Sequence, residues 1–564
     1  MTATRRMLFS LSVIFVFTGG LRAEDVGNFA LIDQDGKFRE LDYYLKQDGV
    51  KGVVIFIQGN GCPLVRKRVP ELNRLSEEYQ QKGVLFCMLN ANPQDERKDI
   101  LEEARLFEIK MPVLKDEAQV VAKSLGVKRT AEVYLLNRQR KIVYRGAVDD
   151  RLSYQSEKPK AEKLYLKEAL MNFVAGKEIT PAVTEAPGCK VTYLVDEENL
   201  TYTKDIAPIL AKNCVSCHTK GGLGPFSMSS YKKVSGWSDM IAEVVMTQQM
   251  PPWHADPTIG EFSNDCGLAP EEAFKIVAWV ANGGPRGEGD DPLESFKPER
   301  PEWQLGKPDH IMDLPAQKVP AEGVLDYRYI TLDNPFDHDV WLTACEVQPG
   351  NTRVLHHVIV TSHAPGSKRN RQWITGYAPG TQGQKYPRGS SVFLKKGHQL
   401  RFQLHYTVSG RPEEDRTRLG LQISKKPTAK IFKTAVVANR RFKIPAGDAE
   451  YGRNFTLPVK KNITLYAINP HMHFRGKSMN FEAHFPDKSK KMLLSVPNYD
   501  FNWQRTYLFK NPVKLPAGSK VFIRNAWDNS KNNPHNPDPS KAIGWGEQSF
   551  DEMFFATLGY VEDE

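Results

Sequence analysis

The sequence has few cysteines for its length, no concentrated basic stripe and no low-complexity segment. Seven cysteines among 564 residues are too few for a disulfide-dense scaffold. The formal net charge of +10 is spread along the chain, and no run of Lys and Arg interleaved with aromatic residues occurs, so we expect no nucleic-acid partner. With 40% hydrophobic residues the chain can bury several cores, and its length predicts about three or four domains.

No long apolar run occurs beyond the N-terminus. There, Arg5 and Arg6 precede an apolar run over residues 7–18, and small residues follow as far as Ala23. This order is typical of a signal peptide, and the run is short for a membrane span. A short buried helix is the alternative. We therefore predict a signal peptide over residues 1–23, a periplasmic or secreted protein, and no integral membrane segment after cleavage.

The stretch "NCVSCHTKGG" contains a Cys-x-x-Cys-His motif. In an exported protein this motif predicts covalent attachment of haem c, with Cys214 and Cys217 forming thioethers and His218 binding the iron. A redox-active cysteine pair is the alternative, and the adjacent histidine makes it the weaker one.

A low-spin haem needs a second axial ligand, and a methionine thioether would raise its reduction potential. Met250 precedes two prolines that hold the chain extended, so it is our candidate, with Met228 and Met246 as alternatives. Amphipathic patterns predict helices over residues 202–212 and 269–284 on either side. This order of parts is similar to small c-type cytochromes.

Two segments rich in Pro, Gly and charge, residues 178–188 and 283–303, read as linkers because they lack an apolar period. They leave three blocks, residues 24–188, 195–285 and 303–564. We predict a multidomain chain with an α/β domain, a small all-α domain and an all-β module in that order.

The first block alternates strand and helix patterns. Apolar runs predict buried strands at residues 52–60 and 84–93 with a helix over 69–83 between them. A helix pattern at 118–127 and two strand patterns within 132–148 follow. Together with "FALIDQDGKFREL", this block resembles the thioredoxin-like redoxin family.

Cys62 follows the first buried strand and precedes the helix, where the resemblance implies a reactive thiolate favoured by the helix N-terminus. Two positions depart from the family. Val65 replaces the second cysteine of CxxC, and Ala131 replaces the proline that faces the active site. The block is then either a docking module or a thiol site built on Cys62 alone or on a bridge to Cys189. We expect negligible insulin-type disulfide reductase activity.

The third block has short alternating runs separated by Pro, Gly and Asn turns, which predict a β-sandwich. Histidines gather in three of these runs. His471 and His473 are two residues apart, so on a strand both project from one face. His405 lies on the polar face of its run. His356 and His357 are adjacent, so they can share a metal only if the strand has a bulge or unusual rotamers.

Imidazole suits zinc, iron or copper, whereas a thioether such as that of Met553 favours copper. Together these residues resemble the copper type II monooxygenases of the peptide-amidating and dopamine-hydroxylating kind. The resemblance implies two jelly-roll halves, residues 303–430 and 431–564, and two copper ions. It assigns the electron-transfer copper to His356, His357 and His405, with Gln403 beside them. It assigns the oxygen-activating copper to His471, His473 and Met553.

Asn469 stands where amidating members carry an arginine for a peptide carboxylate, so a peptidylglycine substrate is not expected. The disulfides of that family are also absent. The remaining histidines of the block that we considered, His363, His398, His484 and His535, read as structural or surface residues.

The overall prediction is an exported monooxygenase whose haem domain passes electrons to a dicopper site that uses O2 on an unknown organic substrate, with a possible external reductant or redox protein. The alternatives are a haem- and copper-containing electron carrier without hydroxylase activity, and a thiol peroxidase whose later domains only dock.

Overall fold

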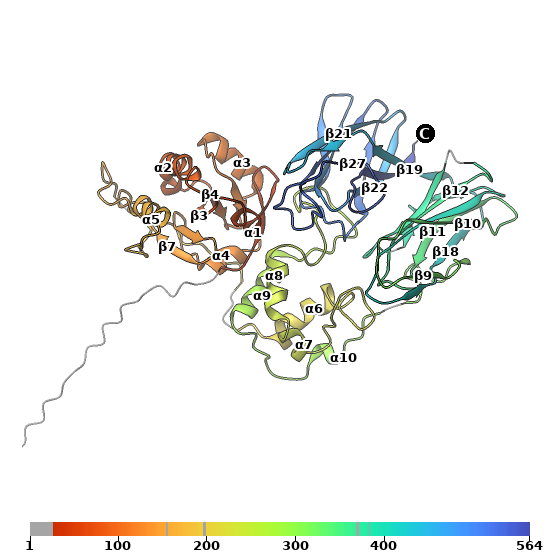
Figure 1. Ribbon diagram of the computed structural model, residues 1–564, viewed down its shortest axis with the longest axis horizontal. Helices are drawn as coiled ribbons and strands as arrows, with labels where there is room; N and C mark the ends of the chain where they lie inside the picture. The colour runs from red at the N-terminus through yellow and green to blue at the C-terminus, as the bar shows by residue number, and fades with distance from the viewer. Residues whose placement is uncertain are drawn as a thin grey trace, which may run out of the picture.

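The computed structural model describes residues 26–153, 156–195, 199–299, 301–367, 371–381 and 383–563. The predicted signal peptide lies outside the described residues. Figure 1 shows an α/β body, a helical body and two β-rich bodies that follow one another along the chain. Among the described residues, none of the helices has both the length and the apolar character that a membrane span requires.

The α/β body is built on one seven-stranded sheet in the order β2-β1-β5-β4-β3-β6-β7. Its strands are β1 (Ala30–Asp33), β2 (Phe38–Glu40), β3 (Gly52–Gln58), β4 (Val84–Asn90), β5 (Val113–Lys115), β6 (Val133–Asn137) and β7 (Ile142–Gly146). Its helices are α1 (Leu41–Leu45), α2 (Pro63–Gln80), α3 (Arg97–Leu106), α4 (Val120–Leu125) and α5 (Tyr165–Val174).

The central strand β3 is buried along its whole length, which explains its continuous apolar sequence. Its side chains alternate between the two faces of the sheet. Phe56 packs in the core cluster that α2 covers, while Ile55 packs in the cluster on the α4 side. The predicted strands and helices of this block are confirmed, and α2 begins six residues earlier than the pattern suggested, directly after Cys62.

The two predicted linkers are packed against the neighbouring bodies. Residues 178–195, here called the strap, run along the α/β body, where Val183 bridges to Arg145 and Lys190 bridges to Arg129. In the second segment Leu293 is only 2% exposed in the helical core. Backbone bridges hold the first segment and a single buried side chain, Leu293, holds the second. Neither kind of contact produces a repeating apolar pattern in the sequence.

The helical body contains a π-helix (Tyr202–Ile206), α6 (Ala207–Asn213), α7 (Tyr231–Ser235), α8 (Ser238–Met246), α9 (Pro270–Ala281) and α10 (Pro292–Ser295). Its core surrounds Trp279 of α9, which is fully buried. The predicted helix at 202–212 is present but begins with a π-helical turn. Pro208 has no N–H to donate to the preceding turn, which interrupts the regular α-helical bonding there.

The β-rich region contains one nine-stranded sheet, two four-stranded sheets and two short two-stranded sheets. Its first strands are β8 (His310–Asp313), β9 (Gln317–Val319), β10 (Arg328–Asp333), β11 (Val340–Gln348), β12 (Leu355–His363), β13 (Gln372–Tyr377), β14 (Gln384–Lys385), β15 (Ser390–Leu394), β16 (Gln399–Tyr406), β17 (Glu413–Asp415) and β18 (Arg418–Ser424). They continue with β19 (Lys430–Asn439), β20 (Lys443–Ile444), β21 (Tyr451–Pro458), β22 (Ile463–His471), β23 (Gly476–His484), β24 (Lys490–Val496), β25 (Tyr507–Leu515), β26 (Lys520–Trp527), β27 (Ile543–Gly544) and β28 (Phe554–Glu562).

The nine-stranded sheet runs through both halves of this region. The strand β19 pairs in parallel with β15 of the first half and antiparallel with β28 of the second. Each half adds a four-stranded sheet, β10-β16-β12-β13 in the first and β21-β26-β23-β24 in the second. The two halves therefore share backbone hydrogen bonds, and the predicted boundary near residue 430 falls at the first residue of the strand that joins them.

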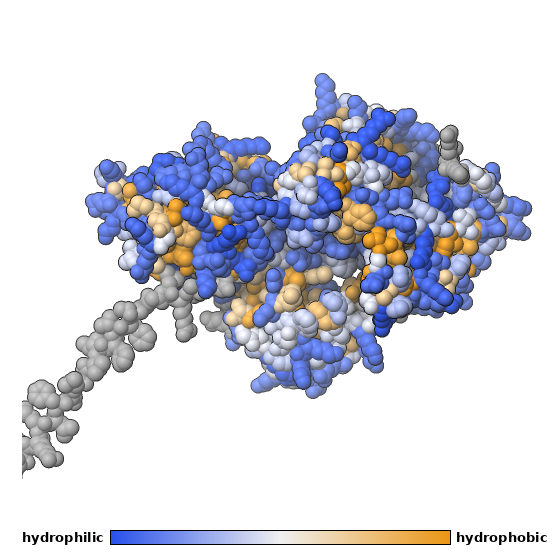
Figure 2. Space-filling model, in the orientation of Figure 1, coloured by the Kyte–Doolittle hydropathy of each residue, from blue (hydrophilic) through white to orange (hydrophobic). Residues whose placement is uncertain are grey.

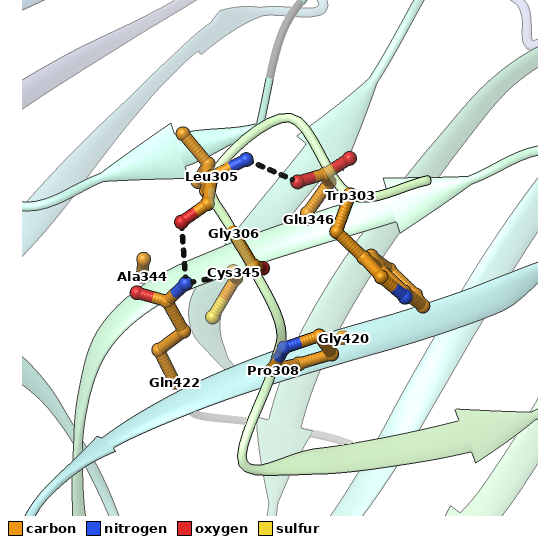
Figure 3. Close-up of a pocket in the computed structure, with 9 residues that line it drawn as sticks. All are labelled: Trp303, Leu305, Gly306, Pro308, Ala344, Cys345, Glu346, Gly420 and Gln422. Carbon is orange, nitrogen blue, oxygen red and sulfur yellow. Dashed lines mark hydrogen bonds between the residues drawn. The ribbon is translucent and has the colours of Figure 1, made fainter. Parts of the chain in front are cut away.

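The entry to the β-rich region is fixed by a small contact site drawn in Figure 3. The Leu305 N–H donates to the Glu346 carboxylate at 2.9 Å, and Gln422 Nε2 donates to the Leu305 carbonyl at 2.7 Å. The cavity between them measures about 10 Å³ and is too small for an organic substrate. Cys345 lies in its wall, fully buried.

The helical body also contacts the second β half directly. Residues 251–266 extend along the edge strand β25, where the Ser263 N–H donates to the Leu508 carbonyl at 2.8 Å. Phe262 and Phe509 form a β-bridge, and Trp253 packs on Tyr507 with ring centroids 4.9 Å apart. In Figure 2 the helical body lies directly below the second β half. The bodies are thus joined by packed contacts in addition to chain connections.

Candidate metal and thiol sites

A β-bulge brings the first three histidines together. The strand β12 pairs with β16 so that Leu355 faces Tyr406 and His357 faces His405, which leaves His356 as the extra residue between two registered pairs. A bulge turns the extra side chain away from strict alternation. Of the two alternatives that the sequence left open, a bulge or unusual rotamers, the strand has the bulge, and both imidazoles lie beside His405.

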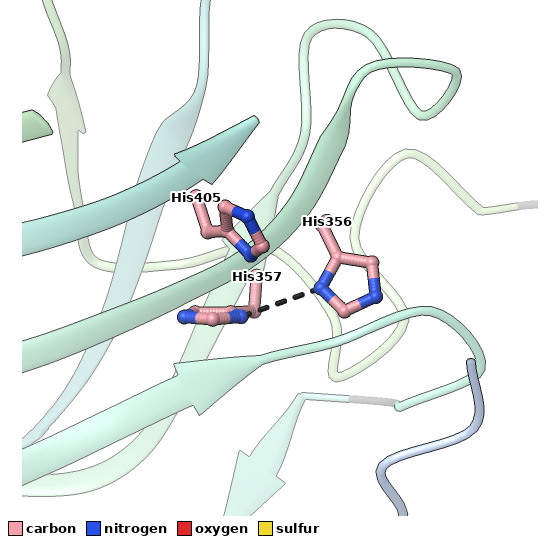
Figure 4. Close-up of side chains that lie close together, drawn as sticks. All are labelled: His356, His357 and His405. Carbon is pink, nitrogen blue, oxygen red and sulfur yellow. Dashed lines mark hydrogen bonds between the residues drawn. The ribbon is translucent and has the colours of Figure 1, made fainter. Parts of the chain in front are cut away.

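These three histidines form a buried cluster, shown in Figure 4. One ring nitrogen of each lies within 4.8 Å of the corresponding atoms of the other two. Within the part of the chain that the structure describes, His356 Nε2 and His405 Nδ1 are buried without a hydrogen-bond partner. An unpaired buried polar atom lowers the stability of the fold by roughly 1–3 kcal/mol. A metal ion that accepts the lone pairs of these ring nitrogens therefore fits the cluster.

Burial lowers the pKa of each imidazole in this cluster. The pKa of His356 falls to about 3 and that of His405 to about 4, while the pKa of His357 lies well below its usual value. Neighbouring histidines add to this effect. All three rings are therefore neutral at physiological pH, which is the form that binds a metal ion.

The His-x-His pair lies at the end of β22. The two ring centroids are 5.2 Å apart, and both side chains are buried. His471 Nδ1 lies 2.7 Å from the Gln504 carbonyl oxygen. Since that oxygen only accepts, His471 donates from Nδ1 and its Nε2 lone pair is left for a ligand. Burial lowers the pKa of His471 to about 4.

Glu552 holds the turn that carries His473. Its fully buried carboxylate accepts from the N–H groups of His473 at 3.0 Å, Arg475 at 2.6 Å and Met553 at 3.1 Å, and from Trp527 Nε1 at 2.9 Å. Burial raises the pKa of this carboxyl to about 7 despite these donors. One side chain thus fixes the backbone at His473, at Arg475 two residues later, and at Met553.

Replacing Glu552 by alanine should lower the free energy of unfolding of the second β half by about 3–5 kcal/mol, because buried donors lose their acceptor. Thermal unfolding monitored by tryptophan fluorescence measures this loss. Glu450→Ala is the control, because Glu450 is an exposed carboxylate of the same half whose ion pair with Lys477 lies at the surface, and it should change stability by less than about 1 kcal/mol. Equal effects of the two substitutions would contradict the role given to Glu552.

The pairing of β22 with β28 places Met553 near the His-x-His pair. His471 pairs with Phe555 in this antiparallel register. The pairing ends there, and beyond it the Glu552 carboxylate accepts from the backbone N–H groups of both His473 and Met553, which brings the two residues close together. The backbone geometry is therefore compatible with the predicted set of two imidazoles and one thioether.

Phe501 links the two histidine groups. Its ring stacks on His356 with centroids 4.7 Å apart and meets His473 edge-on at 5.7 Å. The Gln504 amide also donates to the Phe501 carbonyl at 3.1 Å. Gln504 therefore contacts both His471 and the loop that carries Phe501. The two groups belong to different sheets yet lie on either side of one aromatic ring.

Gln403 lies on β16, where it contacts a tyrosine of the neighbouring strand. Its amide donates to the Tyr329 hydroxyl at 2.9 Å, and that hydroxyl donates to Glu547 at 3.0 Å. The contact joins the first half to the loop before Met553. A catalytic role for Gln403 stays a prediction.

The Cys-x-x-Cys-His residues form one tight turn after α6. The Cys214 carbonyl accepts from the N–H groups of Cys217 at 3.1 Å and His218 at 2.9 Å. His218 Nδ1 lies 3.2 Å from the Phe226 carbonyl, which leaves Nε2 available as an axial ligand. A Cβ at Gly224 would lie 2.6 Å from the same ring, so glycine is required there. The donor set fits the attachment of a haem.

The candidate methionines differ in their surroundings. Met246 is buried in a core cluster of the α/β body, so it does not fit a haem ligand. The Met228 N–H donates to the His218 carbonyl at 2.8 Å, within the helical core. Met250 lies after α8, where its N–H donates to the Val244 carbonyl at 3.1 Å. Its role as second axial ligand stays a prediction.

Cys62 caps the N-terminus of α2 and is 8% exposed. Its Sγ lies 3.6 Å from the Thr130 hydroxyl, and Thr130 precedes Ala131 at the position of the missing proline. Burial raises the pKa of the Cys87 and Cys345 thiols to about 12, which makes them unreactive. Cys62 is therefore the thiol of the α/β body that combines a helix N-terminus with a polar neighbour.

Several contributors have no sequence pattern of their own. Gln504, Phe501 and Thr130 lie outside the motifs and reach their partners only through tertiary contacts. Glu552 directly precedes Met553, and the acidic pair of Asp551 and Glu552 before that methionine is the sequence signal that could have pointed to it. Its pairing with backbone donors follows only from the fold.

Comparison with known proteins identifies the first body. Residues 23–165 match the model of the Redoxin family. The thiol-disulfide oxidoreductase ResA of Bacillus cereus (strain ATCC 10987 / NRS 248) is 24% identical over 154 residues, which cover 24% of this chain and 86% of that protein. ResA of Bacillus thuringiensis subsp. konkukian is 28% identical over 120 residues, covering 21% and 66%.

A solved structure, an uncharacterized conserved protein from Geobacillus kaustophilus, is 28% identical and covers 31% of this chain and 93% of its own, with a TM-score of 0.27. The relatives named here cover between 21% and 31% of this chain. Residues 23–165 are therefore a thioredoxin-like domain of the redoxin type, followed by a helical region and a large β-rich region.

Proposed function

We propose that this chain is an exported haem- and copper-containing monooxygenase-like oxidoreductase, in which the helical region passes electrons to a dicopper site that hydroxylates a C–H bond of an organic substrate. The observation that carries the proposal is the buried triad of neutral histidines, two of which have unpaired ring nitrogens. Copper bound there would supply one-electron chemistry towards O2, with electrons from a c-type haem.

The residues divide into two sets of metal ligands. His356, His357 and His405 would hold one ion through imidazole nitrogens alone. His471 and His473 would hold the other with the Met553 thioether, and a thioether favours copper over zinc. Gln504 orients the His471 ring, and burial lowers the pKa of all five imidazoles, so each can bind a metal without first losing a proton.

The helical region supplies a second set of ligands. Cys214 and Cys217 would form the thioethers and His218 Nε2 would bind the iron, with Met250 as the candidate for the opposite side. The contact between the Phe226 carbonyl and His218 Nδ1 fixes the ring in the tautomer that this role needs.

The docking of the helical region on β25 supports electron transfer between these sets. Residues 251–266 bond to β25, and β25 pairs with β22, which ends at His471. Asn264 Nδ2 also donates to the Thr506 carbonyl at 2.7 Å, two residues beyond Gln504. Two hydrogen bonds and the backbone of residues 504–506 thus connect the helical region to His471.

Asn469 supports a substrate other than a peptide carboxylate. Its amide donates to the Arg505 carbonyl at 2.9 Å and to the Thr506 hydroxyl at 3.3 Å. These bonds hold the loop before β25 in place. A side chain used in this way does not offer a cationic anchor to a substrate.

The proposal predicts that electrons leave the haem through the histidine triad. In stopped-flow mixing of the reduced holoprotein with O2, His405→Ala should slow haem reoxidation by more than about tenfold, since even ligand-orienting changes at metal sites have effects of that size. His398→Ala, which removes a histidine bonded to Ser362 outside the triad, is the matched control. Equal reoxidation rates in the His405 variant and the control would overturn the proposed coupling.

A second candidate function is thiol–disulfide exchange at Cys62. The Redoxin match and the position of Cys62 at the start of α2 favour it, because a helix N-terminus stabilises a thiolate. The two functions occupy different bodies of the chain, so one does not exclude the other.

A further inference from the structure

We infer that Cys189 of the strap is the second thiol of the redoxin domain, and that Cys62 and Cys189 form a reversible dithiol–disulfide pair that reduces a small-molecule disulfide. This inference rests on the proposed thiol chemistry of Cys62. It assigns a role to a cysteine that lies beyond the residues matched to the Redoxin family.

The strap is held against the domain at the place where Cys189 lies. The Thr130 N–H donates to the Cys189 carbonyl at 2.9 Å, and the Val191 N–H donates to the Lys128 carbonyl at 3.0 Å. Arg129 Nη1 also donates to the Gly188 carbonyl at 2.7 Å. These bonds extend the loop before β6 like an added edge strand.

Thr130 joins the two cysteines. Its hydroxyl lies 3.6 Å from Cys62 Sγ and accepts from the Cys189 N–H at 3.1 Å. A Cβ at Gly188 would lie 1.6 Å from the Thr130 carbonyl oxygen, so the close approach depends on glycine. Burial and the neighbouring Cys62 together raise the pKa of the Cys189 thiol, and Thr130 contacts both residues. They are therefore already adjacent in the folded chain.

The helix α2 itself offers no second thiol. Val65 stands at that position, is 1% exposed and packs in the core cluster beneath α2. In the sequence this substitution predicts little dithiol chemistry within α2 and leaves a bridge to Cys189 as one alternative. The strap changes that expectation, because it supplies a cysteine from outside the domain on the solvent side of Cys62.

Exposure assigns the two thiols different steps. Cys189 is exposed and Cys62 is buried, so an external disulfide reaches Cys189 first. The Cys189 thiolate attacks one sulfur and releases the other as a thiol, forming a mixed disulfide. The Cys62 thiolate then attacks Cys189 Sγ and releases the second thiol. Two protein thiols are oxidised to one disulfide, and one external disulfide is reduced to two thiols.

Oxidised glutathione serves as the probe. The reduced, haem-loaded full-length protein is mixed with it, quenched in acid, alkylated and digested, and its peptides are identified by mass spectrometry. We expect a peptide pair linked through Cys62 and Cys189 in the wild-type chain, with little glutathione adduct. In Cys62→Ser the adduct should accumulate on Cys189. Cys87→Ser, which removes a buried thiol of the same domain, should behave like the wild type.

The outcomes separate the inference from the function on which it rests. A glutathione adduct that persists on Cys62 or Cys189 of the wild-type chain, without the linked peptide, would overturn the pair while leaving thiol reactivity intact. Absence of both adduct and linked peptide in every variant, with unchanged circular dichroism, would overturn the proposed thiol function as well.

Discussion

Replacing His357 by alanine is expected to lower the copper content of the loaded chain from about two ions to about one. The three rings form a nearly equilateral triangle, in which the His357 centroid lies 5.6 Å from that of His356 and 5.0 Å from that of His405, and the latter two lie 5.2 Å apart. Without His357 only two imidazoles of the triad remain, and two ligands should hold a copper ion too weakly for it to survive dialysis. The second site, on β22, keeps all of its ligands, so one ion should remain.

Copper content after dialysis, measured by atomic absorption, checks this prediction. His363→Ala is the matched control, because His363 is a buried histidine of the same strand about 20 Å from His357. It should retain both ions. The haem spectrum should be unchanged in both variants, since the haem ligands belong to another body. Unaltered copper content in the His357 variant would rule out the triad as a metal site.

Replacing Cys214 by alanine is expected to remove most of the covalently bound haem. The Cys214 carbonyl anchors the turn that carries Cys217 and His218, so substituting the side chain removes a thioether without removing these backbone bonds. Attachment through Cys217 alone leaves one of two covalent links. The pyridine haemochrome yield of the acid-washed protein should therefore fall sharply, while copper content stays the same.

Cys266→Ala is the control for that experiment. Cys266 is a partly buried cysteine of the same body, outside the Cys-x-x-Cys-His motif, and burial raises the pKa of its thiol. The control should keep a full haemochrome yield. A full yield in the Cys214 variant too would show that the motif does not tether a haem, and the free cysteine pair would then be the better interpretation.

Local patterns were reliable wherever one stretch of chain carries the whole signal. The continuous apolar run of β3 follows from burial on both faces of the sheet. The adjacency of His356 and His357 required a bulge or unusual rotamers because strict alternation would separate the two rings, and the strand has the bulge. His471 and His473 were expected on one face of a strand, but the strand ends at His471, and their rings lie 5.2 Å apart with Glu552 holding the turn that carries His473.

Contacts between segments that are distant in the sequence could not be predicted from local patterns. Residues 178–188 and 283–303 read as linkers because hydrogen bonds to another segment leave no periodicity in the sequence. Gln504 reaches His471 and Phe501 reaches His356 only after the loop before β25 has folded against both halves. The strand β19 joins the two predicted halves into one sheet, which composition alone does not reveal.

The sequence by itself determined the kinds of ligand in this protein, their local spacing and the thioredoxin-like alternation of its first block, because these depend on neighbouring residues. Only the tertiary structure decided which of them meet. It brought His405 to His357 through strand register, set Glu552 beneath His473, and laid the strap so that Cys189 meets Cys62 at Thr130. The physical reason is that each of these contacts joins residues separated by tens of positions, and packing and backbone pairing select among many possible partners.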